Sequence, residues 1–246
     1  MLTHKTTGIV LRTVKYGETS VISTVYTALF GVQSYIVKGV RKQTKTSAGK
    51  AGFFQPGAIL ELLVYHNELK QLQFVKEYSW SYLYNDVFFN VVKNAAALYM
   101  IELLQRSLKQ PEANPELYHL IEDSLKQLDK GSETLTANLP LYFTLHLIGE
   151  LGFRLQGHYC KATPVIDLQE GGFVENIPSH RHYVTGETAD IISKLNLINF
   201  YSDLDGFHMN RMLRREILEV FDQYLALHIE GFGSLKSLLV LKEVLS

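Results

Sequence analysis

The sequence is poor in several features that would narrow its class. It holds a single cysteine, Cys160, in 246 residues, which excludes an internal disulfide framework and fits a reducing compartment. No apolar run approaches the roughly 18 residues that span a bilayer. The opening segment Met1-Leu-Thr-His-Lys5 has no signal-peptide core. We therefore expect a cytoplasmic protein that does not enter a membrane.

Common catalytic motifs are also missing. The sequence has no Gly-rich phosphate loop ending in Lys-Ser/Thr, no Gly-x-Ser-x-Gly elbow and no His-Glu-x-x-His pair. Asp203-Leu-Asp205-Gly206 resembles the start of a cation loop, but no spaced acids follow, so we interpret it as a turn before a helix. We expect no enzyme, no cofactor and no small-molecule substrate.

Charge is distributed unevenly along the chain. Residues 1–80 carry ten Lys/Arg against four Asp/Glu, whereas residues 81–246 carry fourteen against twenty-one. The total of −1 therefore hides a net charge of +6 followed by one of −7. A basic module before an acidic body is typical of a polyanion-binding domain joined to a protein-facing domain.

The basic part reads as strands. Five runs rich in β-forming residues precede residue 80, and no segment before about residue 85 shows a helical apolar period. Five strands, with a long polar connection between the third and fourth, predict a small closed barrel of the OB type. The runs are Gly8–Lys15, Val21–Thr27, Val32–Lys38, Ile59–His66 and Leu69–Tyr78.

Cations gather near the first turn and in the long connection of this barrel. Together with nearby aromatics, they could track phosphates while bases stack. A solvated surface loop is the alternative interpretation of the same charges. Phe53 and Phe54 are more typical of core residues. The predicted DNA-binding cations are Arg12, Lys15, Lys38, Arg41, Lys42, Lys45 and Lys50, and the candidate aromatics are Tyr16, Tyr35, Phe53 and Phe54.

The period changes to 3.6 residues after about residue 86, which predicts a domain of about six helices over residues 81–246. Asn114-Pro115-Glu116 is a strong helix start. An apolar run from Pro140 to Leu151 predicts a central buried helix, and Ser234 is expected to cap the last one. The other helices are expected over residues 87–109, 186–196, 208–229 and 234–245.

Residues 153–185 form an insertion with β-like pieces at 165–168 and 172–174. His158, Cys160, His180 and His182 are the only candidate zinc ligands there. Their i, i+2 spacing and single thiolate favour surface histidines and a free thiol over a metal site. The predicted fold class is thus α+β: an OB-type barrel over residues 1–80, then a helical bundle with a small inserted subdomain.

A further basic cluster, Arg211, Arg214 and Arg215, lies near the start of a long helix. It could be a solvated face, a second DNA contact, or a socket for an acidic peptide tail, since arginine captures carboxylates bidentately. The sequence leaves these three interpretations open.

Several short motifs resemble one family in order as well as in content. In the first domain these are Gly8-Ile-Val-Leu-Arg12, Tyr16-Gly-Glu-Thr19, Gly31, Lys38-Gly-Val-Arg-Lys42 and Gln55-Pro56. Later ones include Glu116-Leu-Tyr118 and Leu147-Ile-Gly-Glu-Leu-Gly-Phe153. The chain resembles the RecO family of bacterial recombination mediators over most of its length.

This resemblance implies a specific function. Family members bind single- and double-stranded DNA, anneal complementary strands without ATP, and with RecR help load RecA onto DNA coated by single-strand-binding protein. Their barrel holds DNA, and their helical domain engages the C-terminal tail of single-strand-binding protein. Arg12, Lys38, Arg41 and Lys42 fall on matching motif positions, whereas Lys15, Lys45 and Lys50 rest on charge alone. A cytoplasmic, nucleoid-associated location follows.

The chain departs from the family pattern at one point, and two other functions also fit its charge pattern. Many members carry a four-cysteine zinc ribbon after the Leu-Gly-Phe segment, but residues 157–185 keep only Cys160. We therefore predict no bound metal, with Tyr159, Val165, Ile166, Phe173 and Val174 packing the subdomain instead. The charge pattern alone also fits an RNA- or ribosome-associated OB protein, or a pure protein-interaction adaptor.

Overall fold

A computed structural model describes residues 2–40, 50–108 and 112–245 of the chain. The described residues divide into two compact units, one within residues 1–85 and 101–125, the other within residues 86–100 and 126–246. The division falls inside helices α1 and α2. None of the helices in the described ranges is long and apolar enough to cross a membrane.

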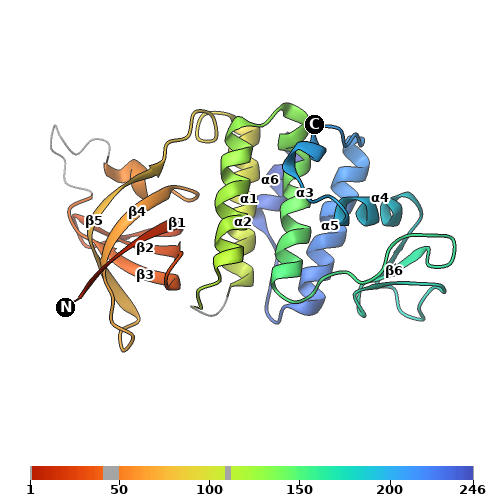
Figure 1. The fold of residues 1–246 in the computed structure, drawn as a ribbon, viewed down its shortest axis with the longest axis horizontal. Helices are drawn as coiled ribbons and strands as arrows, with labels where there is room; N and C mark the ends of the chain where they lie inside the picture. Colours follow the sequence, from red (N-terminus) through yellow and green to blue (C-terminus); the bar gives the residue numbers. More distant parts are fainter. Residues whose placement is uncertain (1, 41–49, 109–111, 246) are drawn as a thin grey trace. The chain divides into compact units, whose positions relative to one another are not determined.

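The first unit contains a closed barrel with strand order β1-β2-β3-β5-β4 (Figure 1), as an OB fold requires. Four of its strand pairs are antiparallel, namely three hairpins and the pair β1–β4, and the parallel pair β3–β5 closes the barrel. The predicted barrel is confirmed. Its strands are β1 (Thr3–Tyr16), β2 (Ser20–Thr27), β3 (Gly31–Val37), β4 (Ile59–Tyr65) and β5 (Leu72–Tyr82), with a short 3₁₀ helix η1 (Lys50–Phe54) before β4.

Two glycines serve the barrel for different steric reasons. Gly31 closes the β2–β3 turn at φ +60°, a conformation that other residues adopt at a cost. Gly8 pairs with both β2 and β4, and a Cβ there would lie 2.6 Å from Val25 Cγ1. Next to it, the register of β1 shifts between Val10 and Arg12. This bulge lets Ile9, Val10 and Leu11 all be buried.

Part of the barrel's outer surface is covered by the helical segment of the same unit. Tyr26, on β2, stacks on Tyr118 with ring centroids 6.2 Å apart, and its hydroxyl donates to the carbonyl of Asn114. Gln105 Nε2 donates to Leu11 O at 2.6 Å. Tyr26 is consequently buried although its register places it on the outside of the sheet.

Six α-helices lie in the described ranges, as the sequence predicts, although two of their starts differ. Helix α3 begins after its cap Ser132, not at Pro140, because Ser132 Oγ accepts from Leu135 N. Helix α6 is preceded by Leu235, so Ser234 does not cap it. The helices are α1 (Val91–Ser107), α2 (Pro115–Lys130), α3 (Glu133–Glu150), α4 (Gly186–Asn196), α5 (Arg211–His228) and α6 (Lys236–Val244), with a 3₁₀ turn η2 (Tyr201–Leu204).

Helix α3 is the buried centre of the second unit. It is apolar on all sides, as predicted, and its buried amide Asn138 donates to the carbonyls of Leu204 and Phe207. Pro140 sits inside the helix, where its missing N–H is tolerated because the surroundings are packed. Thr144 Oγ1 donates to the Pro140 carbonyl at 2.7 Å.

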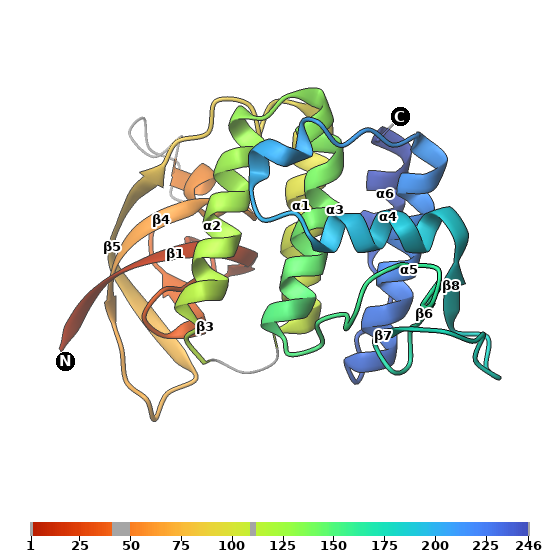
Figure 2. The same ribbon diagram turned by 45° about the vertical axis from the view of Figure 1, so that its right-hand side comes forward.

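The inserted segment folds as a three-stranded sheet of order β7-β6-β8. Figure 2 shows it beside α4 and α5; Val165, Ile166 and Leu168 are buried at its base. His228 on α5 bonds to the Leu168 carbonyl at 2.9 Å. The strands are β6 (Val165–Asp167), β7 (Gly172–Val174) and β8 (Tyr183–Thr185), the last of which the sequence does not predict.

Candidate nucleic-acid interface

One end of the barrel's outer face stays open to solvent. Paired residues in neighbouring strands share a face, so the register aligns side chains in rows across β1, β2, β3 and β5. One row joins Val14, Ile22, Ile36 and Phe74. Two further rows lie beside it on the same face. One begins with Tyr16, which pairs with Ser20, and the other begins with Arg12, which pairs with Thr24. We call these residues, with Lys38, Tyr65 and Lys76, the open face.

The open face combines apolar and aromatic surface with cations. Val14 and Tyr16 are 39% and 49% exposed, whereas the buried rows of the same sheet lie under the helical segment. Arg12, Lys38 and Lys76 are exposed. Among the described residues, neither Arg12 nor Lys38 forms an ion pair, and the Lys76–Glu77 pair is exposed, with N and O 3.7 Å apart. Such a pair contributes little, so the face keeps its positive charge.

Lys38 and Phe74 form the centre of this face. The Lys38 ammonium lies over the Phe74 ring, 5.4 Å from its centroid, a distance at which a cation is attracted to the ring. A hollow of about 470 Å³ opens beside them, lined also by Tyr65, Lys76 and Tyr78. Burial raises the pKa of Tyr78, so its hydroxyl stays protonated and can donate.

The predicted cations divide into three groups. Arg12 and Lys38 lie on the open face. Lys15 is exposed but lies on the opposite side of β1, because it pairs with the inward-facing Val21. Arg41, Lys42 and Lys45 lie outside the described residues, and Lys50 begins η1, with its side chain also outside them.

The candidate aromatics are mostly unavailable for stacking on bases. Tyr35 is fully buried and Phe54 nearly so. Phe53 is half-buried and stacks on Trp80, with ring centroids 4.7 Å apart. Only Tyr16 is exposed among the four. The expectation that Phe54 belongs to the core is confirmed, and stacking on Tyr35 is excluded by its burial.

Sequence reasoning overlooks Phe74, Tyr65 and Lys76. Each lies beyond the long basic connection, on strands read only for their apolar pattern. The available signal is the run Phe74-Val-Lys-Glu-Tyr78, in which aromatics and a cation alternate along a strand. It becomes informative only once the parallel pairing of Ile36 with Phe74 is known.

Comparison with known proteins gives a consistent result. The family model described as Recombination protein O N terminal matches residues 1–84. The model described as Recombination protein O C terminal matches residues 89–239. The chain belongs to the RecO family. Curated relatives of about 30% identity match almost the whole chain, and the name that they share supports a role in DNA repair.

Three such RecO relatives illustrate the similarity, each named DNA repair protein RecO. The protein of Azobacteroides pseudotrichonymphae is 31% identical over 98% of this chain and 98% of its own length. That of Christiangramia forsetii is 32% identical over 99% of each. That of Phocaeicola vulgatus is 30% identical, again over 99% of each.

The second basic cluster of this RecO-family chain does not form one surface. Arg214 is 9% exposed, and its guanidinium donates to Asn138 Oδ1 and Met209 O. Burial lowers its pKa. Arg215 donates to the Lys242 carbonyl and pairs with Glu243. Arg211 alone is exposed and lacks an ion pair to any described acid. Arg214 therefore has a packing role, because it satisfies the buried Asn138 amide.

Three of the four candidate zinc ligands, all but His158, have side-chain partners outside the set. Cys160 Sγ contacts Thr163 Oγ1 at 3.1 Å, His180 pairs with Asp167 at 3.3 Å, and His182 bonds to Gln223. Hydrogen bonding from Thr163 lowers the pKa of the Cys160 thiol. Within the described ranges, no group of three or more His, Cys, Asp or Glu side chains is placed to hold a metal. Absence of bound metal stays a prediction, for elemental analysis to test.

Proposed function

We propose that the chain is a non-enzymatic recombination mediator that binds DNA and anneals complementary strands without ATP. The observation that supports it is the open face, where Arg12 and Lys38, which form no ion pair with a described acid, share a surface with the half-buried ring of Phe74. Such a surface suits phosphates and sequence-tolerant base stacking, not base readout. Family membership gives this chemistry its setting in DNA repair.

Annealing follows from the same electrostatics. Two complementary strands repel each other through their phosphates, and a bound protein that neutralises several of them lowers this repulsion. A face that stacks bases loosely leaves their pairing edges open to a second strand. The basic connection, including Arg41, Lys42 and Lys45, leaves β3 directly after the open face, so we expect its cations to extend the phosphate track.

The partners proposed for the chain are DNA in single- and double-stranded form, RecR, and the C-terminal tail of single-strand-binding protein. In this function the chain helps load RecA onto strands coated by single-strand-binding protein. The helical unit would carry the protein contacts, and Arg211 and Arg215 stay candidates there for an acidic tail or for DNA. We place the chain in the cytoplasm, near the nucleoid.

The decisive experiment follows annealing of two complementary labelled strands by fluorescence transfer, with and without the full-length protein and without nucleotide. We expect annealing to be accelerated at low salt and to fade as salt rises. If the protein neither binds labelled single strands at low salt nor speeds annealing, the proposal fails and the adaptor alternative gains support.

A further inference from the structure

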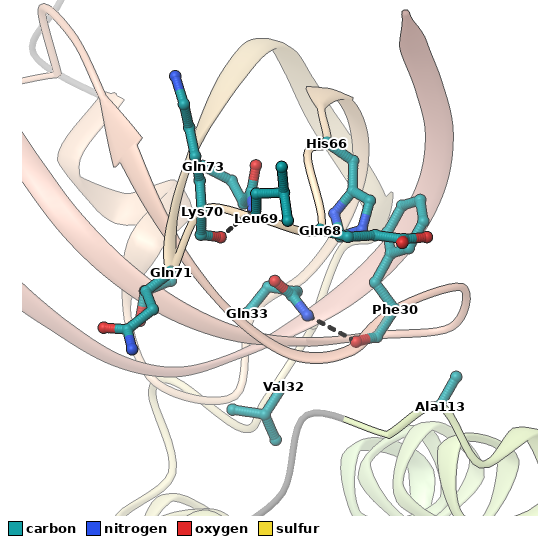
Figure 3. Close-up of a pocket in the computed structure, with 11 residues that line it drawn as sticks. Phe30, Val32, Gln33, His66, Glu68, Leu69, Lys70, Gln71, Gln73 and Ala113 are labelled. Carbon is teal, nitrogen blue, oxygen red and sulfur yellow. Dashed lines mark hydrogen bonds between the residues drawn. The ribbon is translucent and has the colours of Figure 1, made fainter.

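A second hollow lies where the parallel pairing of β3 and β5 stops. Ser34 and Leu72 form the last aligned pair, and the strands then separate toward the β4–β5 turn. The space between them is a cavity of about 660 Å³. Figure 3 shows Gln33 lying between β3 and this turn, with Phe30 and His66 at one side. We call this cavity the seam pocket.

The seam pocket adjoins the open face. Ser34, which lines it, lies two positions before Ile36 on β3, on the same outer side of the strand. Gln33 pairs with the inward-facing Val25 and lies on the inner side, so the lining of the pocket includes both sides of β3. Two positions along a strand span roughly 7 Å, about the reach of one extended nucleotide. A single strand crossing Phe74 and Ile36 would therefore bring its next base to the outer mouth of the pocket at Ser34, from where the base would reach Gln33 through the gap beyond the last β3–β5 pair.

The charge of the lining favours a neutral ligand. Glu68 and Lys70 carry opposite charges, so they add no net charge to the lining. The remaining polar groups come mainly from Ser34, Gln33, Gln71 and Gln73. A phosphate would need more cations than this, since Lys70 is the single one in the lining. Three amides around a hollow are instead suited to a planar group with donors and acceptors.

One amide oxygen is available to receive a ligand. Gln73 is occupied, because it accepts from Asn67 N and donates to the carbonyls of Asn67 and Lys70. Gln33 uses its Nε2 to donate to Phe30 O at 2.8 Å, which fixes the amide. Among the described residues, nothing donates to Gln33 Oε1, so this acceptor is oriented and unoccupied.

Aromatic and apolar groups supply the rest of the pocket. Phe30 and His66 stack with ring centroids 3.9 Å apart, and His4 meets Phe30 edge-on. Burial lowers the pKa of His66, which keeps its ring neutral. Leu69 stands at the rim with 95% of its surface exposed, where it can contact a flat ligand.

We infer that the seam pocket receives one unpaired nucleobase of a single strand bound on the open face. Every base carries an N–H donor on its pairing edge, and Gln33 Oε1 can accept it. In a duplex that edge is already paired, so the pocket distinguishes single strands from duplexes without choosing a sequence. This inference rests on the proposed DNA-binding function and assigns part of it to named residues.

The test uses the full chain and three labelled probes: a thymine strand, a strand of equal length with abasic sites, and a duplex. Fluorescence anisotropy gives each affinity. Gln33→Leu removes the acceptor at similar size, and we expect about a fivefold loss on the thymine strand, as for one hydrogen bond. Affinity for the abasic strand and the duplex should not change.

Two further variants secure the result. Leu69→Ala, at an exposed position that cannot disturb folding, should also weaken only the thymine strand. Gln169→Leu, at an exposed glutamine of the other unit, is the matched control and should bind all probes normally. Equal losses on the three probes, or no loss on the thymine strand, would overturn the inference. No loss on the thymine strand would instead favour another occupant of the pocket, such as a peptide. Absence of binding to every probe by the unaltered protein would refute the proposed function itself.

Discussion

The ammonium of Lys38 lies over the ring of Phe74, so a cation that directly follows β3 and an aromatic of β5 share one spot on the barrel surface. The two residues are far apart in the sequence and meet only because β3 and β5 run parallel. A cation held over a ring can contact a phosphate while the ring's exposed part stacks on the attached base. This pair is the natural target for the first test.

Phe74→Ala should weaken binding to a single strand by about 1–3 kcal/mol, because one stacked base is lost. Affinity for duplex DNA should change less, since its bases are not free to stack on the ring. Tyr35→Phe serves as the control, as the fully buried Tyr35 cannot reach DNA. Titration of labelled single and double strands measures both, and equal losses on the two would contradict stacking.

Reversing charge at Lys38, Arg41 and Lys42 should abolish annealing while the fold is kept. Three phosphate contacts become repulsive, so affinity for a single strand should fall roughly tenfold or more. Lys161→Glu, a single charge reversal at an exposed lysine of the other unit, controls for charge changed away from the barrel. Circular dichroism checks the fold, and unchanged DNA affinity in the triple variant would reject these residues as the contact.

Salt should weaken binding steeply. With five to seven neutralised phosphates, the slope of log affinity against log salt should be about −4 to −5 for a single strand. The triple charge reversal should make this slope shallower by about 2 units, because each lost contact removes roughly 0.7. An anisotropy series gives both slopes; the same series with matched RNA tests the rival assignment, which tighter RNA binding would support.

Arg214→Ala should destabilise the helical unit by about 2–4 kcal/mol, because it leaves the buried Asn138 amide oxygen without its donor. Arg211→Ala, one helical turn earlier and exposed, should shift stability by less than about 0.5 kcal/mol. Urea unfolding compares the two. Equal effects would show that Arg214 is not needed for packing.

Acid should destabilise the helical unit through His146. Its pKa is lowered by burial first, against a hydrogen bond to Ile198 that raises it. Above about pH 6.5 the ring is neutral in both folded and unfolded chains, and stability is complete. As pH falls through the unfolded value toward the lower folded one, the unfolded chain gains protons first and stability drops. His146→Asn should flatten this pH dependence of the urea midpoint, and an unchanged dependence would exclude His146 as its source.

Local pattern was enough for the barrel and for most helices. Alternation of apolar residues places each strand, because slipping by one position would turn the core outward, although β1 begins at Thr3, five residues before the predicted start at Gly8. Pro140 misled the helix prediction, since a proline that usually starts a helix lies here in the middle of one whose cap, Ser132, is eight residues earlier. Tertiary packing outweighs that local signal.

The site was less predictable, because it depends on register and burial. Arg12 and Lys15 look equivalent in the sequence, but three positions along a strand put them on opposite faces. Arg211 and Arg214 differ in a similar way, since only the second meets a buried amide. Gln33 carries no motif at all, and its free oxygen is defined by a turn carbonyl three residues before it.

The closure of the barrel is narrow. Ser34, Tyr35 and Ile36 are the only positions of β3 aligned with β5 in the described register, and parallel pairs are slightly weaker than antiparallel ones. The barrel is therefore expected to open most easily along this line, which runs from the open face at Ile36 and Phe74 to the seam pocket at Ser34. A strand of DNA spanning both would act as a clasp, and amide protons of β3 should exchange more slowly once it is bound.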